Sequence, residues 1–373
     1  MVRCTARGLQ LPMQLAFRQT ARSLQVSKLT RCSYLLRKHL GCAKLRHQLP
    51  GSSCGVRSPS YATTCHAADA GDTGEQQSRN EPQDEMLRTI AVNGEVVVTV
   101  VNAHNLINNA VSRHFTAPTA SAALGRCLTG TLLMATFRGE GETVQVQFKG
   151  DGPLQSMTCI GDHEGNVRGF VGDPQANPPV RADGKLNVGG AIGRGVLTVV
   201  RTLPMLDPYS GMVPITSGEV AEDLAVYLRD SEQSNSALGL GVSIYKDGTV
   251  QSAGGFYVQV LPLVSDSTLD NLERNLTGLP AVTELFNTGK SPQEITEMIL
   301  EGIGCSPGAQ SVEPQYGPCE CNNIRARMLR AVAAIPPDEI EDLLQEQGKV
   351  QVRCEFCCLT VDFDRSDLAQ LLA

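Results

Sequence analysis

Apolar and polar positions alternate with the period of two that is typical of β-strands in several stretches between residues 86 and 264. Residues 88–101 (RTIAVNGEVVVTVV) predict a hairpin around the two-residue turn signal Asn93-Gly94. Residues 143–149 (TVQVQFK) predict a half-buried strand, followed by a turn at 150–153 and further strands near 158–160 and 167–171. A second hairpin is predicted around Asp247-Gly248.

Helical patterns lie between these strands. We expect helices over 104–113, 118–137 and 218–228, with Pro118 suited to the first turn of the second. That second helix is rich in Ala, Gly and Thr, which favours close packing in a buried layer. Residues 86–264 therefore predict an α+β domain with a mixed or antiparallel sheet and helices packed on it.

The pattern changes over residues 265–316, where Gly- and Pro-containing breaks interrupt short helical stretches. The sequence from Ser291 to Glu294 is a capping box, and the residues after it form one apolar stripe, Ile295, Met298, Ile299 and Ile303. Helices this short are marginal unless they dock on a neighbour. We therefore expect a metastable helical linker.

Residues 317–373 read as a small separate module. Two helices are expected over 324–334 and 336–348, and two strands over 349–353 and 359–363. A segment of this size rarely builds a sufficient core by itself, so a metal is the expected staple.

The cysteines indicate which metal. Of the 13 in the chain, Cys127, Cys159 and Cys305 are isolated and predicted to be buried thiols, whereas Cys319-x-Cys321 and Cys354-x-x-Cys357 form two pairs. Four such thiolates supply the tetrahedral shell that one Zn²⁺ prefers. The same thiols can pair as disulfides once the metal leaves, so a structural zinc site and a redox switch both fit. Cys358 is a fifth thiol, which we predict to be inert.

Charge divides the chain unevenly. Residues 1–68 hold eleven Lys and Arg and no Asp or Glu, which leaves a charge of −18 (21 basic, 39 acidic) on residues 69–373. The first segment is typical of an organelle transit peptide, more chloroplast-like than mitochondrial, and 69–85 of a disordered linker. The acidic body disfavours nucleic-acid binding. No apolar run is long enough to span a membrane.

Other candidate motifs give weaker indications of function. The run GGAIGRG at 189–195 does not fit a nucleotide-binding loop, and its glycines are read as turn residues. His163-Glu164 lacks a second histidine at metalloprotease spacing, and Ser231-Glu232-Gln233 is read as a helix end. No nucleophile elbow or triad is evident. We therefore expect a protein that is not an enzyme.

The chain nevertheless resembles a known family, the heat shock protein 33 family of redox-regulated chaperones, over about residues 88–371. The resemblance is carried by a series of short motifs in a fixed order. They are Arg113-His114, Ala123-Leu124-Gly125-Arg126, Gly150-Asp151-Gly152-Pro153-Leu154, Val167-Arg168-Gly169-Phe170, Gly193-Arg194-Gly195, Tyr227 before Ser231-Glu232-Gln233, Ala253-Gly254-Gly255-Phe256, Cys319-Glu320-Cys321 and Cys354-Glu355-Phe356-Cys357.

The resemblance implies an ATP-independent holdase that binds unfolding client proteins and prevents their aggregation under oxidative or heat stress. It implies an inactive reduced form with one Zn²⁺ on Cys319, Cys321, Cys354 and Cys357. Oxidation is expected to form the disulfides Cys319–Cys321 and Cys354–Cys357, release zinc, unfold the linker and favour a homodimer. The released stripe Ile295, Met298, Ile299 and Ile303 is then expected to bind clients.

Two alternatives stay open from the sequence. A constitutive zinc-stabilised binding module would keep the fold without redox gating. A thiol-disulfide oxidoreductase would place its C-x-x-C at the start of a helix, whereas here it is predicted between strands. The chain departs from the family in Cys358 and in its basic N-terminal extension.

Overall fold

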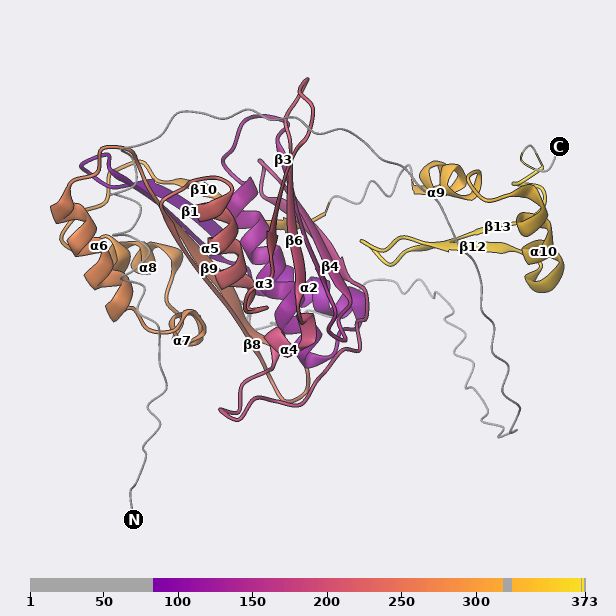
Figure 1. Ribbon diagram of the computed structural model, residues 1–373, viewed down its shortest axis with the longest axis horizontal. Coiled ribbons are helices and arrows are strands. Elements are labelled where there is room, and N and C mark those ends of the chain that lie inside the picture. Colours follow the sequence, from indigo (N-terminus) through magenta and orange to yellow (C-terminus); the bar gives the residue numbers. More distant parts are fainter. Residues whose placement is uncertain (1–82, 318–323, 370, 372–373) are drawn as a thin grey trace, which may run out of the picture. The chain divides into compact units, whose positions relative to one another are not determined.

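The long helix α3 (Pro118–Ala135) lies between two β-sheets and forms the centre of the core (Figure 1). The structure is a computed structural model that describes residues 83–317, 324–369 and 371. Every residue of α3 except Pro118 and Arg126 is buried. A Cβ on Gly130 would lie 2.6 Å from Cδ1 of Leu224, so its small residues allow the close packing that the sequence predicts.

Within the described residues, one sheet has the strand order β10-β1-β2-β9-β8, with every neighbouring pair antiparallel. Its strand β2 is apolar along most of its length because it is covered on both faces: Val101 faces the α3 side, whereas Val98 and Val100 face the opposite side. The strands are β1 (Glu85–Ile90), β2 (Val96–Asn102), β8 (Ser236–Ile244), β9 (Val250–Val260) and β10 (Gln310–Val312).

The second sheet has the order β11-β5-β4-β3-β6-β7 among these residues. Its pairs are antiparallel except that β11 runs parallel to β5. The strands are β3 (Thr143–Gly150), β4 (Ser156–Asp162), β5 (Asn166–Val171), β6 (Gly195–Thr202), β7 (Tyr209–Pro214) and β11 (Gln315–Tyr316).

The helices complete the layers. α2 (His104–His114) and α5 (Val220–Asp230) accompany α3 between the sheets, and α4 (Val188–Ile192) precedes β6. On the other face of the five-stranded sheet lie α6 (Asp266–Gly278), α7 (Val282–Asn287) and α8 (Pro292–Ile299), as Figure 1 shows. The predicted α+β class with mixed and antiparallel sheets is confirmed.

The C-terminal segment has a small core of its own. Helix α9 (Ile324–Val332) and helix α10 (Pro337–Gln347) surround an antiparallel hairpin of β12 (Val350–Arg353) and β13 (Thr360–Phe363). Gly348 ends α10 in the left-handed conformation, as its sequence position predicts. The buried members of this core include Met328, Val332, Ile340, Leu344 and Phe363.

Three features differ from the sequence prediction. The β1–β2 hairpin exists, but its connection is not a two-residue turn: Ala91 N–H donates to the carbonyl of Val96, which leaves residues 92–95 as the loop. The strand β7 was not predicted. The strands β10 and β11 were not predicted either, because segments of two or three residues are too short for an alternating pattern and form only by pairing with existing sheets.

In the described part of the chain, no helix combines the length and the hydropathy that a membrane span requires. Cys127 and Cys159 are buried thiols in the central core, as predicted, but Cys305 is only half-buried. Ser231 follows α5 directly, which confirms that residues 231–233 form a helix end.

Candidate metal centre and its contact with the core

The C-x-x-C segment forms the tip of the β12–β13 hairpin. Because Arg353 pairs with Thr360, residues 354–359 make up the connecting loop. The Cys354 N–H donates to the carbonyl of Leu359 and the Cys358 N–H donates to the carbonyl of Cys354, both at 2.9 Å. These bonds hold Cys354 and Cys357 at the two ends of one tight turn, on which two sulfurs can serve a single metal ion.

The other two predicted ligands, Cys319 and Cys321, lie outside the described residues. Among the residues that are described, no three His, Cys, Asp or Glu side chains gather as a metal site. The two predicted ligands that the structure describes, Cys354 and Cys357, offer sulfur donors, which suit a soft metal ion that prefers thiolates. Their sulfurs come from a loop that the hairpin fixes, with Cys354 itself 3% exposed.

The loop also contacts the core through the residue between its cysteines. The ring of Phe356 meets the ring of Phe170 edge to face, with centroids 5.1 Å apart at 88°. The guanidinium of Arg168 lies 5.5 Å from the centroid of the Phe356 ring. Both partners belong to β5, so the apolar side chain of the C-x-x-C loop packs on an edge region of the six-stranded sheet.

A tyrosine at the end of the linker contacts both the core and the C-x-x-C loop through its hydroxyl group. Tyr316 lies in β11, and its hydroxyl lies 2.7 Å from the carbonyl oxygen of Phe356 and 3.0 Å from that of Gly169. The same hydroxyl lies 2.9 Å from Nε2 of His114 at the end of α2. Burial raises the pKa of Tyr316, so its hydroxyl stays protonated and donates to one of these carbonyls.

His114 occupies the next position in this network. Its Nδ1 lies 3.3 Å from Sγ of Cys358. Burial lowers the pKa of His114, and the charges of Arg353 and Arg113 lower it further, against hydrogen bonds that raise it. The imidazole is therefore neutral near pH 7, with Nε2–H donating to Tyr316 and Nδ1 accepting from the Cys358 thiol.

A pocket of about 560 Å³ opens beside this contact. Its walls come from the end of α2, from β5 and from the hairpin loop, and they include both the thiol and the imidazole. The lining residues used below are His114, Phe115, Phe170, Arg353, Glu355 and Cys358. Phe115 is 76% exposed, so an apolar ring stands open to solvent at this pocket.

The predicted client-binding stripe is covered by the sheet. Ile295 and Ile299 of α8 are each 0% exposed, and Met298 and Ile303 are half-buried against the same cluster. The capping box is present as predicted: Ser291 Oγ accepts from Glu294 N–H, and Ser291 N–H donates to Glu294 Oε2. The stripe thus docks α8 on β1 and β2.

Comparison with known proteins identifies the family that has this architecture. The sequence model described as "Hsp33 protein" matches residues 84–364. The chain belongs to the Hsp33 family.

Among relatives named 33 kDa chaperonin, that of Geobacter sulfurreducens is 39% identical over 289 residues, which cover 77% of this chain and 94% of the relative. That of Symbiobacterium thermophilum is 40% identical, covering 77% and 97%. The crystal structure of the 33 kDa chaperonin from Thermotoga maritima matches with a TM-score of 0.72 and 33% identity, covering 78% of this chain and 98% of that one.

The Hsp33 motifs that the sequence shows have physical roles here. The glycines of the two motifs at 150–152 and 193–195 lie where backbones meet: a Cβ on Gly150 would lie 1.9 Å from the carbonyl oxygen of Ile192, and one on Gly195 2.0 Å from that of Lys149. Gly193 has φ +74° at the end of α4. Gly193 is thus a turn glycine as predicted, whereas Gly150 ends β3 and Gly195 begins β6, where the two strands pair closely.

The motif at 253–256 leaves space on the sheet for a helix of the linker. A Cβ on Gly254 would lie 2.4 Å from Cε2 of Phe286 in α7. The glycine in β9 therefore leaves the space that the Phe286 ring fills. In this Hsp33 protein, the sequence motif of the core and the docking of the linker belong to the same packing arrangement.

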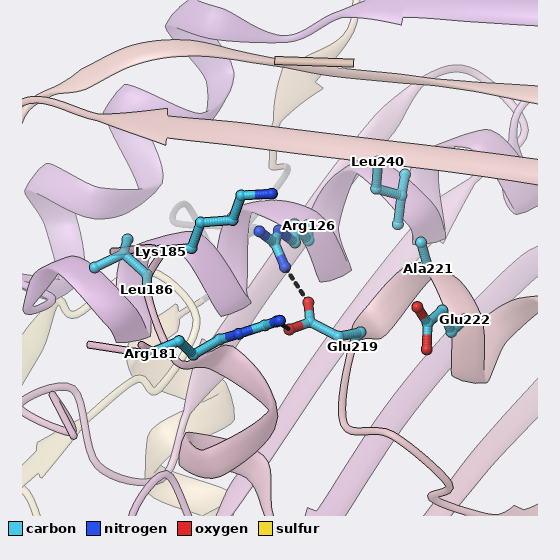
Figure 2. A pocket seen from close by; sticks show the side chains of 8 residues that line it. All are labelled: Arg126, Arg181, Lys185, Leu186, Glu219, Ala221, Glu222 and Leu240. Carbon is cyan, nitrogen blue, oxygen red and sulfur yellow. Dashed lines mark hydrogen bonds and ion pairs between the residues drawn. The ribbon is translucent and has the colours of Figure 1, made fainter. Parts of the chain in front are cut away.

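Arg126 of the α3 motif lines a second pocket, of about 280 Å³. Figure 2 shows Arg126 and Arg181 converging on the carboxylate of Glu219, at 2.5 Å and 3.3 Å. Glu219 immediately precedes α5, so these ion pairs join α3 and the 181–185 loop to the start of that helix. The partial exposure of all three side chains limits what each pair adds to stability.

Sequence reasoning missed Tyr316 as part of the site and assigned no role to His114. The two are 202 positions apart in the chain, and Tyr316 and Phe356 are 40 apart. A tyrosine three residues before Cys319 carries no pattern of its own. Only the pairing of β11 with β5 places it next to the loop.

Proposed function

We propose that this chain is a redox-regulated, ATP-independent holdase that binds unfolding proteins and prevents their aggregation. The observation that carries the proposal is the buried interface between the linker helices and the five-stranded sheet. It joins Ile295 and Ile299 to Val98, Val100 and Val258, all of them buried. Undocking the linker would expose apolar surface on both partners at once, which is what a protein that binds unfolded chains requires.

The linker is suited to reversible release. Its helices α7 and α8 have six and eight residues, lengths that are not stable in isolation. The flanking strands β10 and β11 have three and two residues. Burying each isoleucine contributes roughly 1.5–3 kcal/mol, and Leu272, Leu276, Leu285 and Leu300 of the linker are buried in the same cluster. The helices therefore depend on this docked interface for their stability. Eight acids against two bases between residues 266 and 313 would keep the released segment soluble.

In the reduced state we assign one Zn²⁺ to Cys319, Cys321, Cys354 and Cys357. When bound, zinc supplies the cross-link between the C-x-C segment and the hairpin loop. The chain's own contribution is the tight turn that holds Cys354 and Cys357 and the nearby cations, among them Arg353. A small module of this kind loses much of its folding free energy with its metal.

Oxidation is the proposed trigger. Each pair of thiolates gives up two electrons to one hydrogen peroxide, which takes two protons from water and becomes two water molecules, and one S–S bond forms per pair: Cys319–Cys321 and Cys354–Cys357. A bond across the hairpin loop changes the geometry of Phe356, whose carbonyl Tyr316 binds and whose ring packs on Phe170. Tyr316 belongs to β11, so the change reaches the end of the linker directly.

The released form binds clients through Ile295, Met298, Ile299 and Ile303 together with the uncovered sheet face, and it forms homodimers through the same exposed surface. The activity is binding, without catalysis and without nucleic acid or membrane partners. A thiol-disulfide oxidoreductase is disfavoured because Cys354 and Cys357 lie on a hairpin tip, whereas such enzymes place the motif at a helix N-terminus.

We also propose that the protein acts in an organelle, most simply the chloroplast, with a mitochondrion as the alternative. The support is the basic, acid-free segment 1–68, which lies outside the described residues, and the start of the family match at residue 84. Fusing residues 1–85 to a fluorescent protein tests this localisation. Import into plastids supports the proposal, and a cytosolic fusion contradicts it.

The decisive experiment is light scattering of a thermally aggregating client in the presence of reduced, zinc-loaded or oxidised, zinc-free protein. Suppression by the oxidised form alone supports the redox-gated holdase. Equal suppression by both forms leaves a constitutive zinc-stabilised binding module. A variant with serine at Cys354 and Cys357 separates the thiols from the rest of the chain: it should lose zinc and suppress aggregation without oxidant.

A further inference from the structure

The fifth cysteine of the C-terminal module faces a histidine of the core. Cys358 Sγ lies 3.3 Å from Nδ1 of His114, and Nε2 of the same ring lies 2.9 Å from the hydroxyl of Tyr316. The hydroxyl hydrogen of Tyr316 is directed to a carbonyl oxygen, so His114 donates from Nε2 and accepts at Nδ1. The Cys358 thiol is therefore aligned on the lone pair of an imidazole, which opposes the sequence-based expectation that it is inert.

The thiol and the imidazole both line the pocket of about 560 Å³ at the join of hairpin loop and core. That volume lies within the range of small-molecule sites, about 300–1,000 Å³. Phe115 and Phe170 give it apolar walls, and Arg353 and Glu355 add one charge of each sign. Such a lining suits a peptide-like molecule that carries both a carboxylate and an ammonium group.

The backbone at Cys358 also departs from what its side chain favours. Its φ is +59°, in the left-handed region where glycine is relaxed and a residue with a Cβ is strained. A glycine would close the same turn at lower cost. What cysteine adds at this position is a sulfur in contact with His114 and open to the pocket.

We propose that Cys358 is a thiol-modification site that takes a small peptide disulfide, of which glutathione disulfide is the probe, and that the adduct releases the hairpin loop from the core while Cys354 and Cys357 keep their metal. In the exchange, the S–S bond of the small disulfide breaks and a new S–S bond forms to Cys358. The thiol hydrogen ends on the departing small thiol, so Cys358 is oxidised and half of the disulfide is reduced.

The expected release follows from geometry. After the exchange, Sγ carries a sulfur substituent in place of hydrogen and can no longer donate to Nδ1 of His114. The added chain must occupy the pocket between the loop and α2. Both changes act where Phe356 packs on Phe170 and where Tyr316 binds the Phe356 carbonyl. The proposal deepens the redox-gated holdase and rests on it, because it adds a second trigger to the same linker.

The test treats the full-length, reduced, zinc-loaded protein with glutathione disulfide and follows the adducts by peptide mass spectrometry. Cys305 is the internal control, because it is half-buried like Cys358 but has no histidine partner among the described residues. We expect Cys358 to be modified several-fold faster than Cys305, with zinc content unchanged. Hydrogen exchange of residues 315–317 should rise in step with the adduct.

Two variants sharpen the result. In His114→Gln, the rate at Cys358 should fall towards that at Cys305, whose own rate stays constant. In Cys358→Ser, the glutathione effect should vanish while peroxide still activates the holdase. Equal rates at Cys358 and Cys305 in the wild type overturn the proposal without any variant. Loss of zinc from Cys358→Ser also overturns it, because Cys358 would then be a ligand. Peroxide activation in Cys358→Ser tests the proposed function separately.

Discussion

A Cβ on Gly241 of β8 would lie 2.8 Å from the backbone nitrogen of Thr283 in α7. The next nearest atoms, at 3.0 Å, also belong to α7: Cγ2 of Thr283 and Cβ of Val282. The linker helix therefore rests directly on the sheet backbone at this position. A single methyl group at residue 241 would meet the linker before anything else in the core.

This contact gives a way to undock the linker without oxidation. In Gly241→Ala, the new methyl group overlaps the backbone of Thr283, which cannot swing aside as a side-chain end would. We expect α7 and α8 to detach in a larger fraction of reduced, zinc-loaded molecules. Binding of a hydrophobic fluorescent dye and suppression of client aggregation should both rise before any oxidant is added.

Gly278→Ala is the matched control. Gly278 ends α6 in the same linker, has no heavy atom within 4 Å of its added Cβ and has no positive φ. Its substitution should leave dye binding unchanged and stabilise the fold slightly, by about 0.4–1 kcal/mol. A Gly241→Ala protein that stays inactive until it is oxidised would show that docking of α7 does not hold the chaperone in its resting state.

The linker also shows where sequence reasoning ends. The apolar stripe around Ile295 and the capping box at Ser291 were visible in the chain, because both are local patterns. The surface that receives them was not, since Gly241 and Gly254 read only as small residues in strands. Their role depends on Thr283 and Phe286 arriving from a distant segment, and no periodicity records such a pair.

Tyr316→Phe should weaken the attachment of the hairpin loop. The change removes only the hydroxyl, which leaves the Phe356 carbonyl and Nε2–H of His114 without their partner. An unsatisfied buried polar group costs about 1–3 kcal/mol. We expect the reduced protein to keep its zinc but to need less peroxide for half-maximal activation in a client-aggregation assay.

Tyr245→Phe supplies the comparison for this hydroxyl deletion. Tyr245 follows β8 and is 52% exposed, so its hydroxyl already contacts water and its loss should not move the peroxide dependence. If Tyr316→Phe and Tyr245→Phe need the same peroxide concentration as the wild type, the Tyr316 contact does not link the metal centre to the linker.

His114 predicts a pH dependence of the docked state. Its pKa is lowered, chiefly by burial and also by Arg353 and Arg113, so the docked form binds fewer protons than the released form. The stabilisation is therefore complete above the ordinary histidine pKa of about 6.5 and is lost as pH falls through the lowered value. Tyr316 and Cys358 face the same ring, and burial raises the pKa of Tyr316, so its hydroxyl stays protonated across this range.

The measurement is hydrogen exchange of residues 315–317 in reduced, zinc-loaded protein between about pH 5.5 and 7.5, corrected for the intrinsic exchange rate. Exchange should increase on the acidic side in the wild type. In His114→Gln the corrected profile should be flat, because glutamine does not titrate. A wild-type profile that is equally flat would contradict the buried, neutral state of the imidazole.

Part of the metal centre can be predicted from the sequence, and the rest depends on how the chain folds. The spacing of Cys354 and Cys357 indicates a ligand pair, since two thiols two residues apart fit one turn, and the structure places them on one hairpin loop. The partners of that loop were not predictable. His114 ends a helix and Tyr316 follows the linker, and they meet Phe356 and Cys358 only because β11 pairs with β5.

Ile299→Ala tests whether the buried stripe is itself a client-binding surface. Ile299 is fully buried in the docked linker, so its truncation should destabilise docking by about 2–5 kcal/mol. Reduced Ile299→Ala should therefore suppress client aggregation more than the reduced wild type. Oxidised Ile299→Ala should suppress it less than the oxidised wild type, because a binding side chain has been removed. Met298→Ala, at a half-buried position, should show the first effect weakly and the second to a similar extent. A gain in both redox states would assign client binding to the uncovered sheet face and not to the stripe.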